Sequence, residues 1–293
     1  MSGEIDLIKG GIDIHVHAAP DIQDRKTDCL EIVQKAREYG MGGILIKDHV
    51  TVTSDRAYIL NHIFPDFKVY GSIVLNYPVG GLNPSAVEGA IGLGCRFVFM
   101  PTYCALNHIS VLGKVATLHA NPLPKDAKGI SLLDAKGKLV SEVYEILEII
   151  AKAKVTLATG HISPEETMKL LKAANQHGVE RIIVTHASFK RLTFLDLPDQ
   201  IEAVRMGAFI EHCFVVTTEM MRPVGITTIE EIGNQIRAVG TDHCVLSTDF
   251  GQTGNPHPVE GFRQFALQMF QIGFFDFEIK KMIKLNPLRL LED

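Results

Sequence analysis

The chain has 293 residues, of which 46% are hydrophobic and 22% charged, and its formal net charge at pH 7 is −5. This length allows one large α/β barrel or two ordinary domains, and the charge argues against a nucleic-acid-binding surface. No apolar run approaches the roughly 18 residues that a membrane span needs. Five scattered cysteines, and an N-terminus without a basic and apolar leader, predict a cytoplasmic protein.

Strand-like and helix-like segments alternate along the whole chain. Two of the predicted helices have clear starts: Asn83 precedes Pro84, and Ser163 stands three residues before Glu166 as in a capping box. Eight βα units predict a (β/α)8 barrel, with residues 1–293 forming one domain. The predicted strands lie at about 11–17, 43–49, 68–75, 96–102, 155–160, 181–186, 208–214 and 243–249.

One connection is much longer than the others. An insertion of about residues 103–154 separates the fourth and fifth predicted strands, and it includes a predicted hairpin that pairs 130–133 with 138–140. A long insertion at the catalytic face of a barrel often serves as a lid or a substrate wall. The alternatives for this insertion are surface decoration and an oligomer contact. Independently of its role, we expect the protein to be a homo-oligomer.

The first predicted strand carries the sequence Asp13-Ile14-His15-Val16-His17. Successive side chains on a strand point to opposite faces, so His15 and His17 share a face, with Cα atoms about 6 to 7 Å apart. Two imidazoles at this spacing can bind one metal ion. Other strand ends, which meet at the active-site face of a barrel, carry further ligand-type residues: Lys47-Asp48-His49, His161, His186 and Asp249.

Neutral imidazoles with one carboxylate suit zinc, and manganese, iron and nickel are the alternatives. Such an ion lowers the pKa of a water molecule towards neutrality. Asp249 is placed to take the proton from this water and to pass it to a leaving group. His186 has two open interpretations: it is a second-metal ligand, or it orients the water and stabilises the developing oxyanion.

The ordered set of these motifs resembles the metal-dependent amidohydrolase superfamily. The likeness includes a closing helix over 282–291, and it implies a metal site formed by His15, His17, His161, His186 and Asp249. More narrowly, residues 15–20, 47–49 and 75–84 are similar to an uncharacterised amidohydrolase-like branch. The resemblance therefore implies a fold and a metal site without implying a substrate.

The fourth predicted strand departs from the superfamily pattern. Binuclear members usually bring a bridging carboxylated Lys or a Glu from this strand, but residues 96–103 contain neither. Either the site is mononuclear, held by His15, His17, His161 and Asp249, or Lys47 supplies the bridge as a carbamate. We predict one tight metal site, with a weaker second one allowed, and Lys47 facing substrate as a catalytic group. The plainer alternative for Lys47 is a salt-bridged lysine at a strand end.

Further residues in the loops that follow the strands are candidates for contact with substrate. A basic residue there can hold an anionic substrate, since Arg binds carboxylates in a bidentate manner; Lys190, Arg191 and Arg222 are weaker candidates of this kind. The predicted substrate-binding residues are His49, Arg56, Asn76, Tyr103 and His108.

Together these features predict a metal-dependent hydrolase. Its expected target is a C–N bond in a small cyclic amide, imide or amidine, or the ester bond of a related lactone or ester. A metal-dependent decarboxylase or hydratase is the first alternative, and a Schiff-base lyase using Lys47 is the second. In each case the expected partner is a small molecule, either neutral or anionic. Neither a nucleic acid nor a membrane is expected as a partner.

Overall fold

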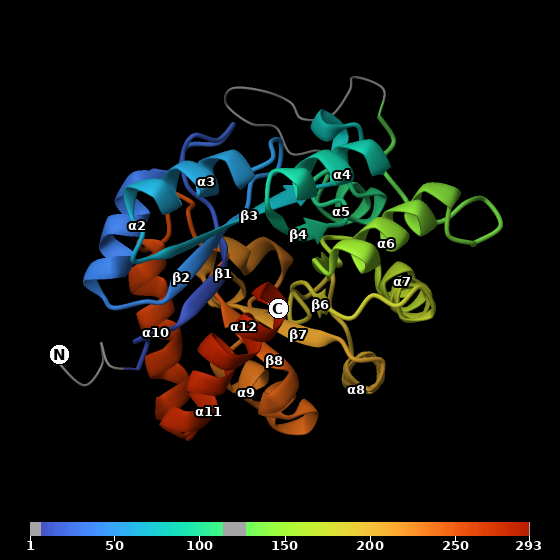
Figure 1. The fold of residues 1–293 in the computed structure, drawn as a ribbon. Coiled ribbons are helices and arrows are strands. Elements are labelled where there is room, and N and C mark those ends of the chain that lie inside the picture. The colour runs from blue at the N-terminus through green and yellow to red at the C-terminus, as the bar shows by residue number, and fades with distance from the viewer. Residues whose placement is uncertain (1–6, 114–126, 293) are drawn as a thin grey trace.

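In the computed structural model, which describes residues 7–113 and 127–292, eight parallel strands form a barrel (Figure 1). Each strand pairs with the next in chain order, and a parallel bridge between Val16 and Phe250 joins the last strand to the first. The predicted (β/α)8 barrel is therefore confirmed. The strands are β1 (Ile12–Val16), β2 (Gly43–Ile46), β3 (Lys68–Val74), β4 (Cys95–Phe99), β5 (Thr156–Ala158), β6 (Ile182–Val184), β7 (Phe209–Cys213) and β8 (Cys244–Ser247).

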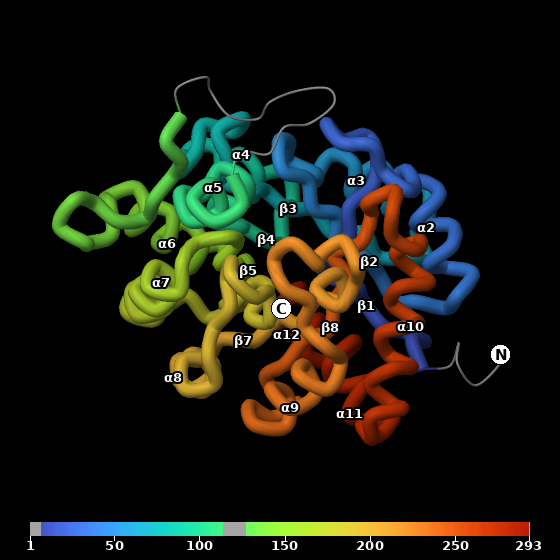
Figure 2. Tube along the Cα trace, turned by 180° about the vertical axis from the view of Figure 1, so that it is seen from behind, coloured from blue at the N-terminus to red at the C-terminus, as the bar shows by residue number. Residues whose placement is uncertain are grey.

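Helices surround the barrel, as both views show (Figures 1 and 2). No helix in the described ranges is both long and apolar enough to cross a membrane. The α-helices are α2 (Cys29–Glu38), α3 (Ser54–Ile63), α4 (Pro84–Gly92), α5 (Leu106–Leu112), α6 (Ser141–Ala153), α7 (Pro164–Gln176), α8 (Leu197–Arg205), α9 (Ile229–Val239), α10 (Pro258–Gln271), α11 (Asp276–Lys280) and α12 (Asn286–Leu291). Short 3-10 turns follow β7, namely η2 (Phe214–Thr217) and η3 (Glu219–Val224).

The two ends of the barrel interior differ in chemistry. The interior at the N-terminal ends of the strands is filled by apolar side chains such as Phe97 and Phe99. Leu290 and Leu291 of α12 pack against them. Thr156, at the start of β5, donates a hydrogen bond of 2.5 Å from Oγ1 to the carbonyl of Leu290. Helix α12 thus closes the N-terminal end of the barrel, and Figure 1 shows it at the centre of the ring of strands. The polar strand-end residues remain at the opposite end.

The helix starts follow the local sequence signals. The Ser163 side chain accepts a hydrogen bond from the Glu166 amide, and Glu166 accepts one from the Ser163 amide, which completes the predicted capping box of α7. At the start of α4, ahead of Pro84, the Asn83 side chain accepts a hydrogen bond from the Ala86 amide. These caps satisfy amides that a helix cannot pair internally. They also define where the loops that precede α4 and α7 end.

The predicted hairpin of the insertion is present, but it lies away from the barrel mouth. Leu133 and Leu139 form an antiparallel bridge, and the Leu132 amide donates to the Glu166 carboxylate at the start of α7. Lys169 of α7 donates to the Gly137 carbonyl at 2.7 Å. Figures 1 and 2 both place this hairpin at the periphery, beyond α6 and α7. The hairpin is therefore docked on α7, and the insertion segment 114–126 lies outside the described residues.

Candidate metal centre and cavity

Two strand ends carry unusual backbone conformations. His186, two residues after β6, has φ of 56°, and Asp249, two residues after β8, has φ of 52°. A positive φ is uncommon outside glycine and persists where the surroundings hold it in place. The Asp249 amide donates to the His15 carbonyl at 2.8 Å, and the His17 amide donates to the Phe250 carbonyl. Barrel closure thus holds Asp249 beside the histidines of β1.

Three of the predicted ligands meet at one carboxylate oxygen. The Nε2 atoms of His15 and His17 lie 3.2 and 3.0 Å from Oδ1 of Asp249. The potential ligand atoms of these three residues all lie within 4.8 Å of one another. Both histidines are buried, whereas the Asp249 side chain is 14% exposed to solvent. The group therefore has nitrogen and oxygen donors on one side and an opening on the other.

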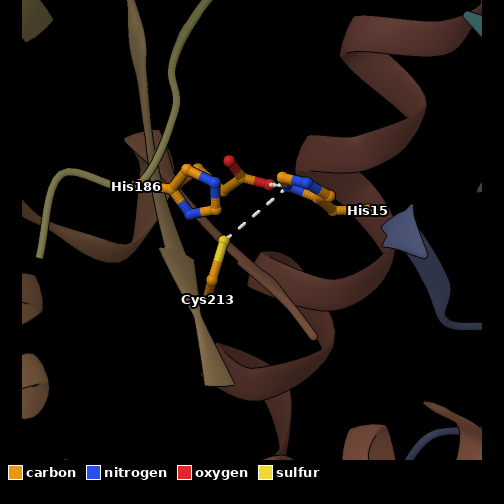
Figure 3. A group of neighbouring side chains, drawn as sticks. His15, His186 and Cys213 are labelled. Carbon is orange, nitrogen blue, oxygen red and sulfur yellow. Dashed lines mark hydrogen bonds and ion pairs between the residues drawn. The ribbon is translucent and has the colours of Figure 1, made fainter. Parts of the chain in front are cut away.

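Beneath His15 lies a second set of polar groups. Nδ1 of His15 donates to Oε1 of Glu211 at 2.9 Å, and the same oxygen accepts a hydrogen bond from Ser247 at 2.8 Å. Figure 3 shows His15, His186 and Cys213 pointing toward a common space, with the Cys213 sulfur 3.8 Å from Nδ1 of His15. His15, His186, Glu211 and Cys213 form a second potential ligand group, and all four are buried. A carboxylate on the far nitrogen is the usual support of a metal-ligating histidine.

The surroundings of His15 leave a place for a cation. Lys47 Nζ lies 2.9 Å from Nε2 of His15, on the side where Asp249 lies at 3.2 Å. If His15 is neutral, Nε2 accepts from Lys47 but faces the Asp249 oxygen, which is another acceptor. If His15 is charged, Nε2 donates to Asp249 but faces the Lys47 ammonium, which is another donor. A divalent cation held by Nε2 and Asp249 satisfies both acceptors, so these residues fit a metal ion.

The two remaining predicted ligands lie beside this group. His186 Nε2 is 3.7 Å from Oδ2 of Asp249, and the His161 ring is 5.2 Å from the His186 ring, centre to centre. His161 Nδ1 and His108 Nδ1 are 2.9 Å apart. Within the described residues, Nε2 of His161 and Nδ1 of His186 are buried without a hydrogen-bond partner. Buried polar atoms are nearly always paired, so these two nitrogens are available to a ligand.

Burial and the neighbouring Lys47 act to lower the pKa of His15, but the carboxylates of Glu211 and Asp249 outweigh them and raise it. The electrostatic environment favours the ligand forms of the other four side chains. Burial, more than any neighbouring charge, holds the pKa of His17 and His161 well below the ordinary value and lowers that of His186 to about 4. Burial acts to raise the pKa of Asp249, but contacts with His15 and His17 outweigh it and hold that pKa well below its usual range. Neutral imidazoles and an ionised carboxylate are the states that bind metal ions.

A cavity of about 440 Å³ opens over this group. Three of the predicted substrate-binding residues, His49, Tyr103 and His108, line it together with Lys47 and Asp249. Their rings are arranged in two stacked pairs: His49 on Tyr103 at 3.7 Å, and His108 on His161 at 5.0 Å, measured between ring centres. The start of the insertion therefore contributes Tyr103 and His108 to the cavity, whereas its hairpin does not line it.

The other two predicted substrate-binding residues are engaged elsewhere. Asn76 is buried behind the cavity, where it donates to the His49 carbonyl and accepts from the Thr102 amide, both at 2.9 Å. It thereby ties the ends of β2 and β4 together. Arg56 lies outside the cavity lining and donates at 2.9 Å to the Pro20 carbonyl and to the Asp48 carboxylate. Its contacts stabilise loops and leave its guanidinium away from the metal centre.

The three weaker basic candidates also lie outside the lining. Lys190 pairs with Glu231 at 2.8 Å, Arg222 with Glu219, and Arg191 faces the Pro223 carbonyl. Among the described residues of the cavity lining, Lys47 is the only lysine or arginine.

Sequence reasoning missed several residues at this site. Glu211 lies within β7, and its carboxylate accepts the hydrogen bond from Nδ1 of His15. Arg25 lies in the β1–α2 loop, and its guanidinium is 3.3 Å from Nδ1 of His17 while it pairs with Asp21 at 2.7 Å. The apolar lining from η3 also carried no signal in the sequence, because exposed methionines are common in loops. An acidic residue inside an apolar strand was the one available signal, and it pointed to Glu211.

Residues 10–211 match the family described as "Family of unknown function (DUF6282)". The chain belongs to this family. The matched range contains His15, His17, Lys47, His161 and His186, whereas Asp249 lies beyond it. No curated protein sequence matches the chain.

Solved structures extend the comparison of this DUF6282 member to its full length. An amidohydrolase from Pseudomonas aeruginosa is 13% identical, with 99% of this chain and 98% of that chain covered and a TM-score of 0.66. The probable dipeptidase PvdM from the same organism is 12% identical, with 99% and 96% covered and a TM-score of 0.66. A 2,6-dihydroxybenzoate decarboxylase from Rhizobium is 10% identical, with 97% and 98% covered and a TM-score of 0.57. At these identities the likeness establishes the fold, and it agrees with the (β/α)8 barrel described above.

Proposed function

We propose that this protein is a metal-dependent hydrolase that cleaves a C–N bond in a small cyclic amide, imide or amidine, or the ester bond of a related lactone or ester. One observation carries the proposal: His15 and His17 converge on a single oxygen of Asp249, at the mouth of the barrel and beside a cavity. Catalytic groups of such barrels lie at this end. Zinc is the favoured ion, because imidazole and carboxylate are its ordinary ligands.

The proposed ligands are His15, His17, His161, His186 and Asp249. A divalent ion bound there would polarise a substrate carbonyl and lower the pKa of a water molecule. Asp249, ionised and partly exposed to the cavity, would accept a proton from this water and return it to the leaving nitrogen or oxygen. His186, which lies 3.7 Å from the second oxygen of Asp249, would steady that carboxylate or serve as a ligand.

Lys47 has a distinct place in the proposal. It is buried, it lines the cavity, and burial lowers the pKa of its amine. A cation bound at His15 would compete with its contact to Nε2, and we propose that the released amine donates a hydrogen bond to the substrate oxygen. The carbamate alternative stays a prediction, tested by a mass increase of about 44 Da on Lys47 in the intact protein.

The test combines metal analysis with isotope labelling. Purified protein should contain about one tightly held divalent ion per chain, and the His15→Ala/His17→Ala double variant should lose it while remaining folded by circular dichroism. A panel of cyclic amides, imides, amidines and lactones is then incubated in water labelled with oxygen-18. Hydrolysis places one label in the new carboxyl group of an amide, imide or lactone, or in the new amide carbonyl of an amidine, and chelation should abolish turnover. Folded wild-type protein that binds no divalent ion would contradict the proposal.

The same panel separates the two alternatives. The decarboxylase alternative is kept because the Rhizobium decarboxylase shares the fold. Aromatic carboxylates added to the panel would then release carbon dioxide and leave an aromatic product without the label. The Schiff-base alternative uses Lys47, and reduction with borohydride in the presence of a carbonyl substrate would attach that substrate to the lysine. Label incorporation without trapping supports the hydrolase.

A further inference from the structure

We propose that the substrate carries a flat aromatic group, which the cavity holds against an apolar wall while the reactive carbonyl faces Asp249. This inference rests on the proposed function, because it assigns a role to the apolar side chains that line the same cavity. It narrows the substrate class from any small cyclic amide or lactone to those attached or fused to an aromatic ring.

The cavity lining contains both polar and apolar side chains. Its polar members include Lys47, His161 and Asp249 of the candidate metal centre, and also Gln23, Asp24, Gln252 and Thr253. Five apolar side chains, which we call the apolar wall, come from three connections of the barrel: Leu112 of α5 after β4, Phe189 after β6, and Val215, Met220 and Met221 of η2 and η3 after β7. A small-molecule site of this kind places the body of the ligand on the apolar side and a few polar groups at its reactive end.

The size of the cavity suits one ring and a reactive group. Its volume is about 440 Å³, whereas an engineered apolar cavity of about 150 Å³ is sufficient to bind benzene. The remaining space accommodates a carbonyl, its leaving group and a small substituent. A substrate built only from a small polar head would leave the apolar wall in contact with water.

The side chains of the lining favour a flat group over a bulky aliphatic one. Ring planes within the two stacked pairs differ by 19° for His49 on Tyr103 and by 15° for His108 on His161. Aromatic faces and edges attract other aromatic rings in offset or edge-on contacts. Thioethers such as those of Met220 and Met221 also contact aromatic rings favourably and adapt to their shape.

The exposure of Met220 and the charges of the lining residues also favour an aromatic ligand. Met220 is 41% exposed and lines the cavity, so it is accessible to a ligand. Within the described part of the lining, Lys47 supplies the only lysine or arginine, whereas Asp24 and Asp249 supply carboxylates. An uncharged aromatic body matches both the apolar wall and this charge balance.

Three hydroxamates with the same metal-binding head test the proposal by calorimetry on the zinc-loaded protein. Acetohydroxamate carries only a methyl group, benzohydroxamate a flat ring, and cyclohexanecarbohydroxamate a puckered ring of similar volume. We expect benzohydroxamate to bind about tenfold more tightly than acetohydroxamate and at least about threefold more tightly than the cyclohexyl compound.

A pair of methionine variants locates the effect. Met221→Ala should weaken benzohydroxamate binding about fivefold and change acetohydroxamate binding by less than about twofold. Met206→Ala is the matched control, because Met206 is also partly buried but lies at the end of α8 outside the cavity lining. It should change neither affinity.

The outcomes separate this inference from the proposed function. Equal affinities for acetohydroxamate and benzohydroxamate would overturn the aromatic assignment without contradicting the proposed metal centre. Equal weakening of both compounds by Met221→Ala would have the same meaning. Equal affinities for the flat and puckered rings would overturn the preference for a flat group. If the protein holds no zinc and binds none of the three, the proposed function fails and the inference fails with it.

Discussion

The two ring nitrogens of His15 have separate neighbours, and this separation defines the candidate site. Nδ1 donates to Glu211, and Nε2 faces Lys47 and Asp249. Glu211 is buried, yet its contacts with His15 and Ser247 outweigh burial and lower its pKa to about 2. The ionised carboxylate thus keeps the proton of His15 on Nδ1 and leaves the Nε2 lone pair for a cation.

Removing Glu211 should therefore weaken metal binding without removing a ligand. We expect Glu211→Ala to raise the zinc Kd about 10- to 100-fold, and Glu211→Gln, which still accepts from Nδ1, to raise it less. Competition with a chelating dye measures both values. Glu260→Ala is the control, since Glu260 pairs with Arg263 on α10, 25% exposed. An unchanged Kd in Glu211→Ala would show that the carboxylate does not support His15.

A histidine outside the site should contribute to the pH dependence of folding. His257 caps α10, and burial, followed by nearby Lys35, lowers its pKa from the ordinary 6.5 to about 4. Between these values the unfolded chain takes up a proton that the folded chain does not. Stability from His257 is therefore complete above pH 6.5 and is lost as the pH falls towards 4.

We expect His257→Asn, which keeps a capping acceptor, to reduce the loss of unfolding free energy between pH 7 and 4.5. The expected reduction is about 1 kcal/mol, after allowance for the partial exposure of the ring. Urea titrations at several pH values measure it. His62→Asn, at an exposed histidine of α3, is the control. Identical pH profiles for wild type and His257→Asn would contradict the prediction.

At the scale of elements, the start of α7 joins the candidate site to the insertion. Ser163 lies two residues after His161, and Glu166 completes the capping box while accepting hydrogen bonds from the Leu132 amide and the Ser131 hydroxyl. One buried carboxylate therefore holds a helix terminus and the hairpin together. This explains why the hairpin lies against α7 and away from the barrel mouth.

Glu166→Ala should destabilise the fold by about 2 kcal/mol, because it removes the capping interaction and leaves the Leu132 amide unpaired. Its neighbour provides a matched control: Glu165 is 68% exposed and pairs with Lys169, so Glu165→Ala should cost less than about 0.5 kcal/mol. Chemical denaturation compares the two. Similar losses in both variants would show that Glu166 does not tie the insertion to α7.

At the scale of the whole molecule, the barrel has an apolar end closed by α12 and a polar end that holds paired and unpaired side chains. Six histidines (His15, His17, His49, His108, His161 and His186), Lys47 and the carboxylates of Glu211 and Asp249 are concentrated in the polar end, and burying such groups costs stability unless each finds a partner. A bound cation would supply the missing partner. Metal binding should therefore stabilise the entire fold.

Zinc at a free concentration of 100 times its Kd should raise the unfolding free energy by about 2.7 kcal/mol, seen as a higher Tm in a thermal scan. The His15→Ala/His17→Ala double variant should show no such rise. If zinc raises the Tm of both proteins equally, it binds elsewhere than at the candidate centre.

The sequence by itself determined the number of strands, the helix caps and the strand ends that carry ligand-type residues. These depend on local rules: alternation along a strand, the hydrogen bonds of a helix terminus, and the shared direction of parallel strands. Residues such as His15, His17 and Asp249 could therefore be selected before their contacts were known.

Only the tertiary structure decided which of these groups touch. Glu211 reaches His15 across 196 residues of sequence, and Lys47 reaches it across 32. Both contacts depend on how the strands are staggered as the barrel closes, and no local pattern specifies that register. The same holds for the apolar wall, because Leu112, Phe189 and Met221 come from the separate connections that follow β4, β6 and β7. Their meeting over Asp249 follows from loop packing, which the alternation of strands and helices leaves open.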